Sequence, residues 1–280
     1  MTNRNLYFSL LKLNNQYLNA YTIKLFLLFI NSFKNEQELF LNFDKEITYS
    51  KLDSDISLLK EGYPIQYLIN KSCFCGMDLF IKEGVLIPRN ETEELVIETA
   101  KLIHYFFGEE NKLNVLDLCC GSGCIGLGLK KYLPSINLFS SDISDTCLEV
   151  TKMNSDKLYF PSCIIKSDLF SSLDMNLKFD VIISNPPYIS DISTIEKRVY
   201  DYEPHLAILA ASSTTFYERI FEEYKNYVNK KFILAFEINE LDKNKLEDLI
   251  KNKYKFSHYY FKKDMYNKDR FLFIYENNNY

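Results

Sequence analysis

The chain has 280 residues, of which 47% are hydrophobic and 25% are charged, and its net charge is −5 with a pI near 5.4. A hydrophobic fraction of this size excludes an intrinsically disordered chain. The acidic balance disfavours a broad nucleic-acid-binding surface, although a local basic patch stays compatible with it. The most apolar run, Leu25–Ile30, is far shorter than the roughly 20 residues that a membrane-spanning helix needs, so we expect no membrane contact.

The seven cysteines have neither the paired spacing of a zinc site nor the framework of a secreted disulfide-rich domain. The opening residues, Met1–Phe8, are too polar to form a secretion signal. These features predict a cytoplasmic protein with reduced thiols that pack as small hydrophobic side chains; a regulatory disulfide is the alternative. None of the three histidines belongs to a motif, and we predict no metal site.

The chain contains two regions with different periodicity. From residue 3 to about residue 70, apolar residues such as Leu25, Leu28 and Phe29 recur at helical spacing. Between Cys73 and Ile87, short apolar runs separated by glycine predict a hairpin. We therefore expect a helical domain at 1–70, a hairpin linker at 71–90 and a larger α/β domain at 91–280.

From Leu113 onward, strand-like runs alternate with helical ones. This alternation predicts a parallel sheet with helices on both faces. The last two runs are joined by a short polar turn and predict one antiparallel strand near the edge. The predicted strands are Asn114–Cys119, Ile136–Ser141, Ser162–Lys166, Phe179–Ser184, Phe232–Ile238, Phe256–Phe261 and Phe271–Tyr275.

A glycine-rich loop, G-S-G-C-I-G at Gly121–Gly126, follows the first of these strands. It matches the pattern G-x-G-x-x-G, in which Gly121 and Gly123 allow close approach of the backbone to a nucleotide, with Ser122 between them. The pattern alone does not separate NAD, FAD and S-adenosylmethionine, because all three are bound by this architecture.

Three aspartates narrow the choice of cofactor. Asp142 ends the second strand, where a carboxylate can bind both ribose hydroxyls, and Asp168 follows the third strand. Asp117 lies within the first strand and needs a partner if it is buried. The ammonium group of S-adenosylmethionine, which NAD lacks, can supply that partner. The alternative is that Asp117 caps the glycine turn and Asp168 caps the start of a helix.

The sequence N-P-P-Y at Asn185–Tyr188 follows the apolar strand Phe179–Ser184. Pro186 and Pro187 cannot donate to a sheet ladder, so we expect a stiff loop at the carboxyl end of the strand, where ligands bind in open α/β sheets. The Asn185 side-chain oxygen and the Pro186 carbonyl can accept both hydrogens of a planar –NH₂ group, and Tyr188 can stack on it. An ordinary turn after a strand is the alternative.

The ordered motifs resemble one family, the protein-(glutamine) N5-methyltransferases that modify the Gly-Gly-Gln loop of class I peptide-chain release factors. The resemblance covers nearly the whole chain. It includes the segments E-G-Y-P-I-Q-Y-L at Glu61–Leu68, V-L-I-P-R-N-E-T-E at Val85–Glu93, L-D-L-C-C-G-S-G-C-I, S-N-P-P-Y-I, and D-Y-E-P-H-L-A at Asp201–Ala207.

The resemblance implies a Rossmann-like methyltransferase fold with a mostly parallel seven-stranded sheet, preceded by a small helical domain that docks the protein substrate. It also implies S-adenosyl-L-methionine as cofactor and release factors as partners. We expect no direct nucleic-acid substrate, because the net charge is acidic, and we expect a monomer. The implied cofactor residues are Asp117, Cys119, Cys120, Gly121, Ser122, Gly123, Asp142, Asp168, Leu169 and Asn185. The implied catalytic residues are Asn185, Pro186 and Tyr188, and the implied substrate residues add Pro187, Pro88, Arg89 and Thr92. A plain capping role for Glu91 and Thr92 is equally compatible.

Three positions depart from the family pattern. Cys119 replaces a glycine, Asn90 replaces the second proline of I-P-R-P-E-T-E, and Asn239 in E-I-N-E stands where glycine is usual. The alternative functions are a glutamine methyltransferase of a ribosomal protein, an adenine amino-group methyltransferase, and a binding module without activity. The first two share the asparagine–proline loop, and the acidic balance disfavours the adenine enzyme.

Overall fold

The computed structural model describes residues 1–108 and 112–277 and divides them into two compact units. The N-terminal unit consists of Met1–Lys71 together with Glu196–Tyr202, and the sheet unit consists of Ser72–Ile195 and the residues from Glu203 onward. The last three residues of the predicted third domain lie outside the described part of the chain, as do residues 109–111.

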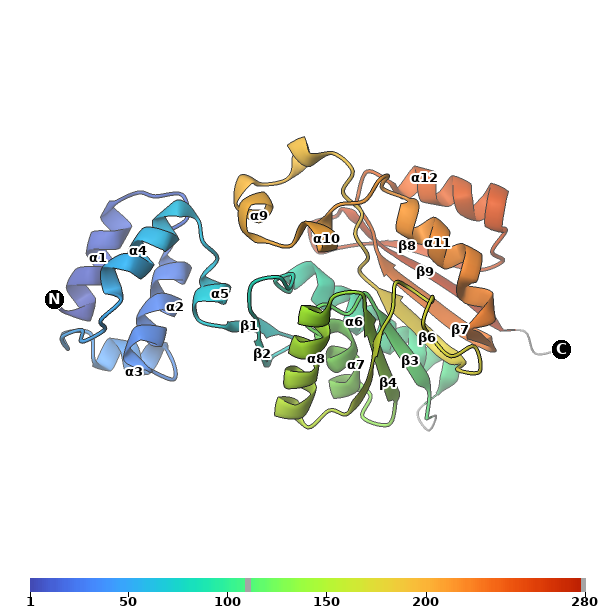
Figure 1. Cartoon of the computed structure of the whole chain (residues 1–280), viewed down its shortest axis with the longest axis horizontal. Helices are drawn as coiled ribbons and strands as arrows, with labels where there is room; N and C mark the ends of the chain where they lie inside the picture. The colour runs from blue at the N-terminus through green and yellow to red at the C-terminus, as the bar shows by residue number, and fades with distance from the viewer. Residues whose placement is uncertain (109–111, 278–280) are drawn as a thin grey trace. The chain divides into compact units, whose positions relative to one another are not determined.

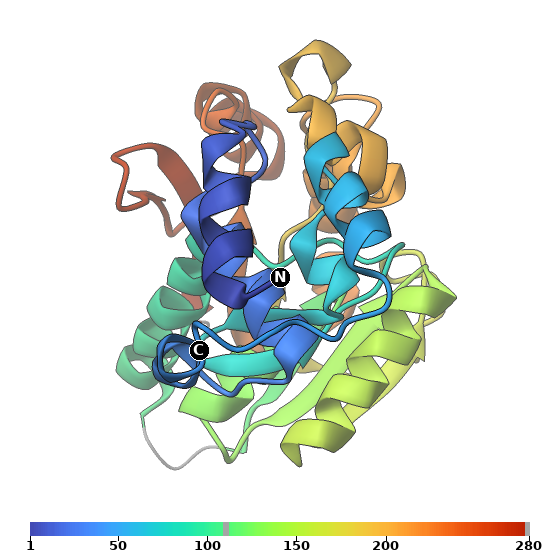
Figure 2. The same ribbon diagram turned by 90° about the vertical axis from the view of Figure 1, so that its left-hand side faces the viewer.

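The N-terminal unit is built from short helices; those within residues 1–71 are drawn in blue to cyan in Figures 1 and 2, and the helix within Glu196–Tyr202 is drawn in gold. Polar side chains cap the first three of them: Thr2, Asn19 and Asn35 each accept a hydrogen bond from a backbone N–H in the first turn. Gly62, with φ of +98°, ends the fourth helix. The helices are α1 (Asn3–Lys12), α2 (Ala20–Asn31), α3 (Glu36–Leu41), α4 (Leu52–Glu61), α5 (Ile65–Leu68) and α9 (Lys197–Tyr202).

The apolar faces of these helices form a core of their own. It contains Leu10 of α1, Phe26 and Leu27 of α2, and Leu59 of α4, all almost fully buried. Helix α9 comes from far along the chain, and its Tyr202 ring lies 5.4 Å from the Tyr63 ring in an edge-on contact. The helical periodicity of residues 3–70 thus corresponds to helices that pack into one unit. The segment Glu196–Tyr202, distant in the sequence, also belongs to this unit.

The large sheet of this unit has, in the described part of the chain, seven strands in the order β5-β4-β3-β6-β7-β9-β8. Neighbouring strands from β5 to β7 are parallel, while β9 is antiparallel to both β7 and β8, which confirms the mostly parallel sheet with one antiparallel strand near the edge. The strands are β3 (Asn114–Leu118), β4 (Asn137–Asp142), β5 (Ser162–Lys166), β6 (Phe179–Ser184), β7 (Val228–Glu237), β8 (Tyr259–Lys263) and β9 (Asp269–Asn277).

Helices cover both faces of this sheet (Figure 1). Alternate strand residues point to opposite faces, so Val181 packs with α6 and α7 while Ile182 packs with α11 and α12. Helix α8 packs beside β4 and β5. The helices are α6 (Asn90–Phe107), α7 (Cys124–Tyr132), α8 (Asp145–Leu158), α10 (His205–Ile208), α11 (Thr215–Glu223) and α12 (Lys243–Asp248), with 3₁₀ turns at Ile192–Thr194 and Tyr224–Asn226 and a π-helix at Leu249–Tyr254.

A hairpin joins the N-terminal helices to α6. It consists of β1 (Lys71–Phe74) and β2 (Met77–Phe80), which pair as a two-stranded sheet. Phe74, Met77 and Leu79 are buried in the same core cluster as α6 and α7. The hairpin is therefore packed into the sheet unit as part of its core.

Only β5 and β6 match their predicted bounds at both ends, and the other five strands begin or end at a different residue. Strand β4 begins one residue later than predicted, β7 begins at Val228 before the predicted Phe232, and β8 begins at Tyr259 after the predicted Phe256. Phe256 is nevertheless buried, because it packs into the core from the segment that follows the π-helix. Apolarity alone therefore placed that strand too early.

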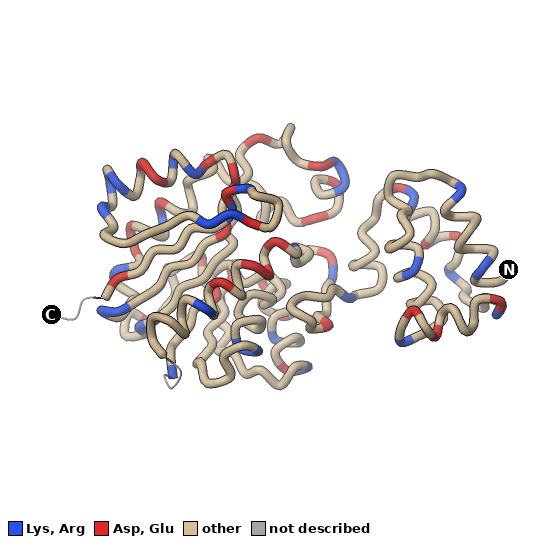
Figure 3. Tube along the Cα trace, turned by 180° about the vertical axis from the view of Figure 1, so that it is seen from behind, with Lys and Arg blue, Asp and Glu red and all other residues tan. Residues whose placement is uncertain are grey.

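Lysine, arginine, aspartate and glutamate are interspersed along the trace of the sheet unit (Figure 3). Within residues 1–108 and 112–277, no helix combines the length and the apolar character that crossing a membrane requires.

Candidate active site

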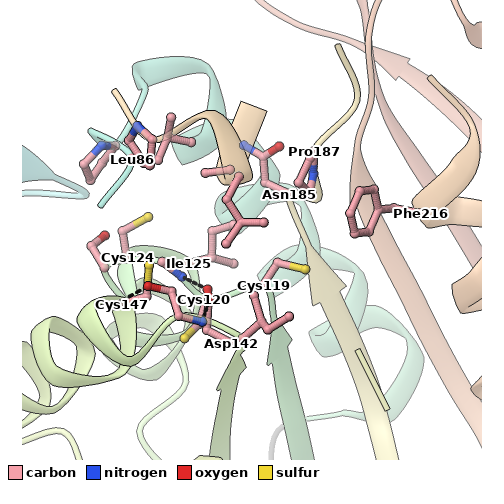
Figure 4. A pocket seen from close by; sticks show the side chains of 18 of the residues that line it. Leu86, Cys119, Cys120, Cys124, Ile125, Asp142, Cys147, Asn185, Pro187 and Phe216 are labelled. Carbon is pink, nitrogen blue, oxygen red and sulfur yellow. Dashed lines mark hydrogen bonds between the residues drawn. The ribbon is translucent and has the colours of Figure 1, made fainter. Parts of the chain in front are cut away.

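A cavity of about 270 Å³ opens at the carboxyl ends of the parallel strands in the sheet unit (Figure 4). Loops that follow β3, β4, β5 and β6 all contribute to it, as expected for an open α/β sheet. Among the residues predicted for the site, the cavity is lined by Pro88, Arg89, Thr92, Cys119, Cys120, Gly121, Ser122, Asp142, Asp168, Leu169, Asn185 and Pro187. Asp117, Gly123, Pro186 and Tyr188 lie close by in the sequence but are not among its lining residues.

The glycine loop after β3 has a left-handed backbone at three positions. Cys119, Gly121 and Gly123 have φ of +61°, +55° and +77°. Cys119 therefore adopts a conformation that glycine enters more easily, which accounts physically for the glycine that the family pattern has there. A Cβ on Gly121 would meet no atom within 4 Å, so the loop faces open space at that point.

Asp142 joins the glycine loop to the end of β4. One carboxylate oxygen accepts the Gly121 N–H at 2.9 Å and the other accepts the Ser144 N–H at 2.9 Å. Burial raises the pKa of Asp142, and these backbone hydrogen bonds oppose that rise. Asp142 lines the cavity, and a carboxylate with two acceptor oxygens suits recognition of vicinal hydroxyls.

Asp117 is fully buried beneath this loop. Its Oδ2 accepts the Gly126 N–H in the first turn of α7 at 2.9 Å, while its Oδ1 has no hydrogen-bond partner among the described residues. Desolvation raises the pKa of Asp117 to about 7. The alternative role of Asp117, as a cap for the backbone near the glycine turn, thus accounts for Oδ2. It leaves Oδ1 without a partner among the described residues.

Asp168 lines the cavity and does not begin a helix, because the residues that follow it form turns. Its Oδ1 accepts a hydrogen bond from Arg219 of α11 at 2.9 Å. Leu169 is buried at φ of +49°, and the Arg219 guanidinium lies 5.8 Å from the centre of the Phe216 ring. Phe216 and Arg219 also line the cavity, and the sequence analysis did not identify them.

Asn185 and Pro187 enter the cavity from the end of β6 (Figure 4). The Asn185 Nδ2 lies 3.5 Å from Thr92 Oγ1, and the Tyr188 hydroxyl donates to Glu237 Oε1 at 3.0 Å. The Tyr188 ring packs against the core cluster on the α11 face of the sheet. The segment is therefore fixed to its surroundings at both ends.

Glu237 is a residue of this site that the sequence analysis missed. It ends β7, is 3% exposed, and accepts hydrogen bonds from Thr92 Oγ1 at 2.6 Å and from Tyr188. The available signal in the sequence is an acid at the end of an apolar strand, in F-E-I-N-E. The N-cap residue of α6 makes no side-chain capping hydrogen bond. Thr92 does not cap the helix, because its hydroxyl donates to the Glu237 carboxylate.

All seven cysteines are free thiols. Cys119, Cys120, Cys124 and Cys147 line the cavity, and burial raises the pKa of each, that of Cys147 to about 12. These thiols are therefore protonated at neutral pH and unreactive as nucleophiles. The described residues contain no group of three or more His, Cys, Asp or Glu side chains that could hold a metal ion.

The chain is similar to known methyltransferases in sequence and in fold. A family model described as the methyltransferase small domain matches residues 94–201. A release factor glutamine methyltransferase of Flavobacterium psychrophilum is 38% identical over 219 residues, or 76% of each chain. One of Bacillus anthracis is 35% identical over 246 residues, which cover 85% of this chain and 87% of that protein.

Among solved structures, the N-terminal domain of human METTL16 in complex with SAH aligns with a TM-score of 0.52 and 15% identity, covering 79% of this chain and 78% of that one. At that identity the likeness shows the fold, a Rossmann-like methyltransferase domain. The two bacterial relatives are far more similar in sequence, and their alignments span most of both proteins. The chain therefore belongs to the family of release factor glutamine methyltransferases.

Proposed function

We propose that this protein transfers a methyl group from S-adenosyl-L-methionine to the side-chain amide nitrogen of the glutamine in the Gly-Gly-Gln motif of class I peptide-chain release factors. One observation carries the proposal: Asn185 and Pro187 line the same cavity as the glycine loop and Asp142. The carboxylate that would bind the nucleoside, Asp142, and the loop that would bind the substrate amide, Asn185–Tyr188, thus meet at one cavity. The names of the relatives supply the substrate.

The residues of the cavity suit S-adenosylmethionine. We assign the ribose hydroxyls to Asp142, the adenine to Asp168 and Leu169, and the methionine portion to the loop from Cys119 to Gly123. The unpaired Asp117 Oδ1 and the buried, unpaired Ser122 Oγ support this assignment, because they are polar atoms without a protein partner among the described residues. When bound, this cofactor supplies an electrophilic methyl group on sulfur and leaves as S-adenosylhomocysteine.

We assign the substrate glutamine to the N-P-P-Y loop, with Pro88, Arg89 and Thr92 as the neighbouring wall. An amide nitrogen is a poor nucleophile because its lone pair is delocalised into the carbonyl. Asn185 Oδ1 and the Pro186 carbonyl would accept its two hydrogens, with Tyr188 flanking the amide plane. This arrangement increases the negative character of the nitrogen and directs its lone pair at the methyl carbon, so the rate gain comes from orientation and electrostatics. The proton leaves after the N–C bond has formed.

We assign docking of the release factor to the N-terminal unit, because one glutamine side chain offers too little surface for specificity. The proposal includes a monomer that works in the cytoplasm without a nucleic-acid substrate. The net charge of −5 supports the last point, since phosphate backbones are bound through an excess of lysine and arginine.

Labelled methyl transfer from S-adenosylmethionine tests the proposal. The purified protein should label an intact release factor, and replacing the glutamine of its Gly-Gly-Gln motif should abolish the label. Parallel reactions should contain ribosomal protein, DNA and RNA. Labelling of one of these, with none of the release factor, would overturn the proposed substrate.

A further inference from the structure

The carboxylate of Glu237 connects two segments of the site that are distant in the sequence. Thr92 Oγ1 of α6 donates to Oε2 at 2.6 Å, and the Tyr188 hydroxyl donates to Oε1 at 3.0 Å. Thr92 is 145 residues from Glu237 and Tyr188 is 49 residues away. Both carboxylate oxygens are therefore used: one donor, Thr92, lies beside Asn185, and the other donor, Tyr188, follows Asn185 by three residues.

The direction of these hydrogen bonds determines how Asn185 is oriented. An ionised carboxylate only accepts, so the single hydroxyl hydrogen of Thr92 is committed to Glu237. The Thr92 oxygen can then only accept a second hydrogen bond. The Asn185 group that faces it at 3.5 Å must therefore be the –NH₂, which turns the Asn185 Oδ1 to the other side.

The surroundings of Glu237 decide whether its carboxylate is ionised. Burial raises its pKa, and Glu91 on α6 acts in the same direction. The hydrogen bonds from Thr92 and Tyr188 and the positive charge of Arg270 on β9 oppose that rise. The ionised form is the one that accepts from both hydroxyls at once, so the observed pair of hydrogen bonds matches it.

We propose that Glu237 is a positioning residue that, through Thr92, holds the Asn185 amide with its oxygen available to the substrate amide, an assignment that rests on the proposed function. Without this constraint, Asn185 could rotate by half a turn and present its –NH₂ to the –NH₂ of glutamine. Two donors would then face each other, and the substrate nitrogen would lose an acceptor. The second hydrogen bond of Glu237 holds Tyr188, three residues beyond Asn185, in the same frame.

Two substitutions test the polarity of this network. Glu237→Gln keeps the shape but replaces one acceptor with a donor, so Thr92 and Tyr188 cannot both donate to it. Thr92→Val keeps the shape of the side chain and removes the hydroxyl. Each should lower kcat for release factor methylation by about ten- to a hundredfold, the range expected when one oriented contact in the transition state is impaired. The Kd for S-adenosylmethionine and the KM for release factor should change by less than about threefold.

The chain offers a matched control in Thr99→Val. Thr99 lies on the same helix α6, is fully buried, and its Oγ1 has no hydrogen-bond partner among the described residues. It should keep the kcat of the unmodified protein. Thr92→Ser, which retains the hydroxyl, should recover at least about tenfold in kcat over Thr92→Val.

The outcomes separate this inference from the proposed function. If the unmodified protein does not methylate release factor, the proposed function fails and the inference falls with it. If it does so and both variants keep a kcat within about threefold of Thr99→Val, only the inference is overturned. It is also overturned if Thr92→Ser behaves like Thr92→Val, or if kcat falls only in proportion to cofactor affinity or thermal stability. Should Glu237→Gln fail to fold, the three threonine variants alone decide the question.

Discussion

The Arg89 guanidinium donates to the Glu203 carboxylate at 2.6 Å, although the two residues are 114 positions apart in the sequence. The second oxygen of Glu203 accepts the Ile87 N–H at 3.1 Å, and Glu203 is 4% exposed. This contact joins the segment before α6 to the segment before α10, and both segments line the cavity. The wall of the candidate site is thus closed by one buried carboxylate.

Removing the cation from this pair should destabilise the protein. Arg89→Met leaves the buried Glu203 carboxylate with the Ile87 N–H as its one hydrogen-bond donor among the described residues, so we expect the free energy of unfolding to fall by about 2 kcal/mol. Arg219→Met is the matched control, because Arg219 also lines the cavity but forms a more exposed ion pair with Asp168, and it should cost less than about 1 kcal/mol. Urea unfolding of both variants measures the difference, and equal losses would contradict the expectation.

Asn185→Ala should separate catalysis from cofactor binding. Removing the amide oxygen should lower kcat by about 10² to 10³, the scale measured for one oriented polar group in a transition state. Affinity for S-adenosylmethionine, measured by calorimetry, should change little. Asn176→Ala provides a control, since Asn176 is on the surface and, among the described residues, its side chain bonds only to Asp174. A kcat close to that of the control would refute the acceptor role.

Asp117 should make stability depend on pH. Its pKa in the folded protein is about 7, above the ordinary value of 3.8, so the folded state binds a proton more tightly than the unfolded state does. The free energy of unfolding should therefore fall as pH rises from about 4 to about 7, by on the order of 3 kcal/mol from this group. Asp117→Asn cannot ionise and should lack this contribution. Urea unfolding at pH 5 and pH 8 compares the two proteins, and parallel pH profiles would exclude a buried titrating carboxyl.

Gly126→Ala should disturb the packing of α7 on the sheet. An added Cβ would lie 2.8 Å from Leu138 Cδ1 and 2.9 Å from Asp117 Oδ2, so those groups would have to move. We expect a loss of about 2 kcal/mol. Gly128→Ala on the same helix meets its nearest neighbour, Val96 Cγ1, at 3.2 Å, and both changes gain similar helix propensity. Thermal unfolding should show the smaller effect for Gly128→Ala, and the reverse order would contradict this packing.

The sequence predicted the sheet and the edge at which the cavity lies, because local patterns determine both. Parallel strands read as apolar runs, and their carboxyl ends meet at one edge, so Asp142 and Asn185 could be placed together before any contact was known. Strand ends were less certain. Asn229–Lys231 is polar, and only its pairing with neighbouring strands extends β7 back to Val228.

The roles of Glu237 and Glu203 could not be predicted in this way. Each is an acid beside an apolar or proline-containing segment, and such a residue is most often solvated. Their partners, Thr92 and Arg89, lie 145 and 114 residues away, and only the tertiary packing of the sheet unit brings them within hydrogen-bonding distance. The spacing of residues along the sequence does not indicate that Thr92 lies near Glu237 or that Arg89 lies near Glu203.

Helix α9 belongs to the N-terminal unit, although the residues on both sides of it belong to the sheet unit. The polypeptide consequently crosses between the units three times, after residues 71, 195 and 202. A protease that cuts only at the first crossing would leave the fragment 1–71 retained by noncovalent contacts such as Tyr63 with Tyr202. Deleting residues 1–71 would likewise remove the helices with which α9 forms one unit.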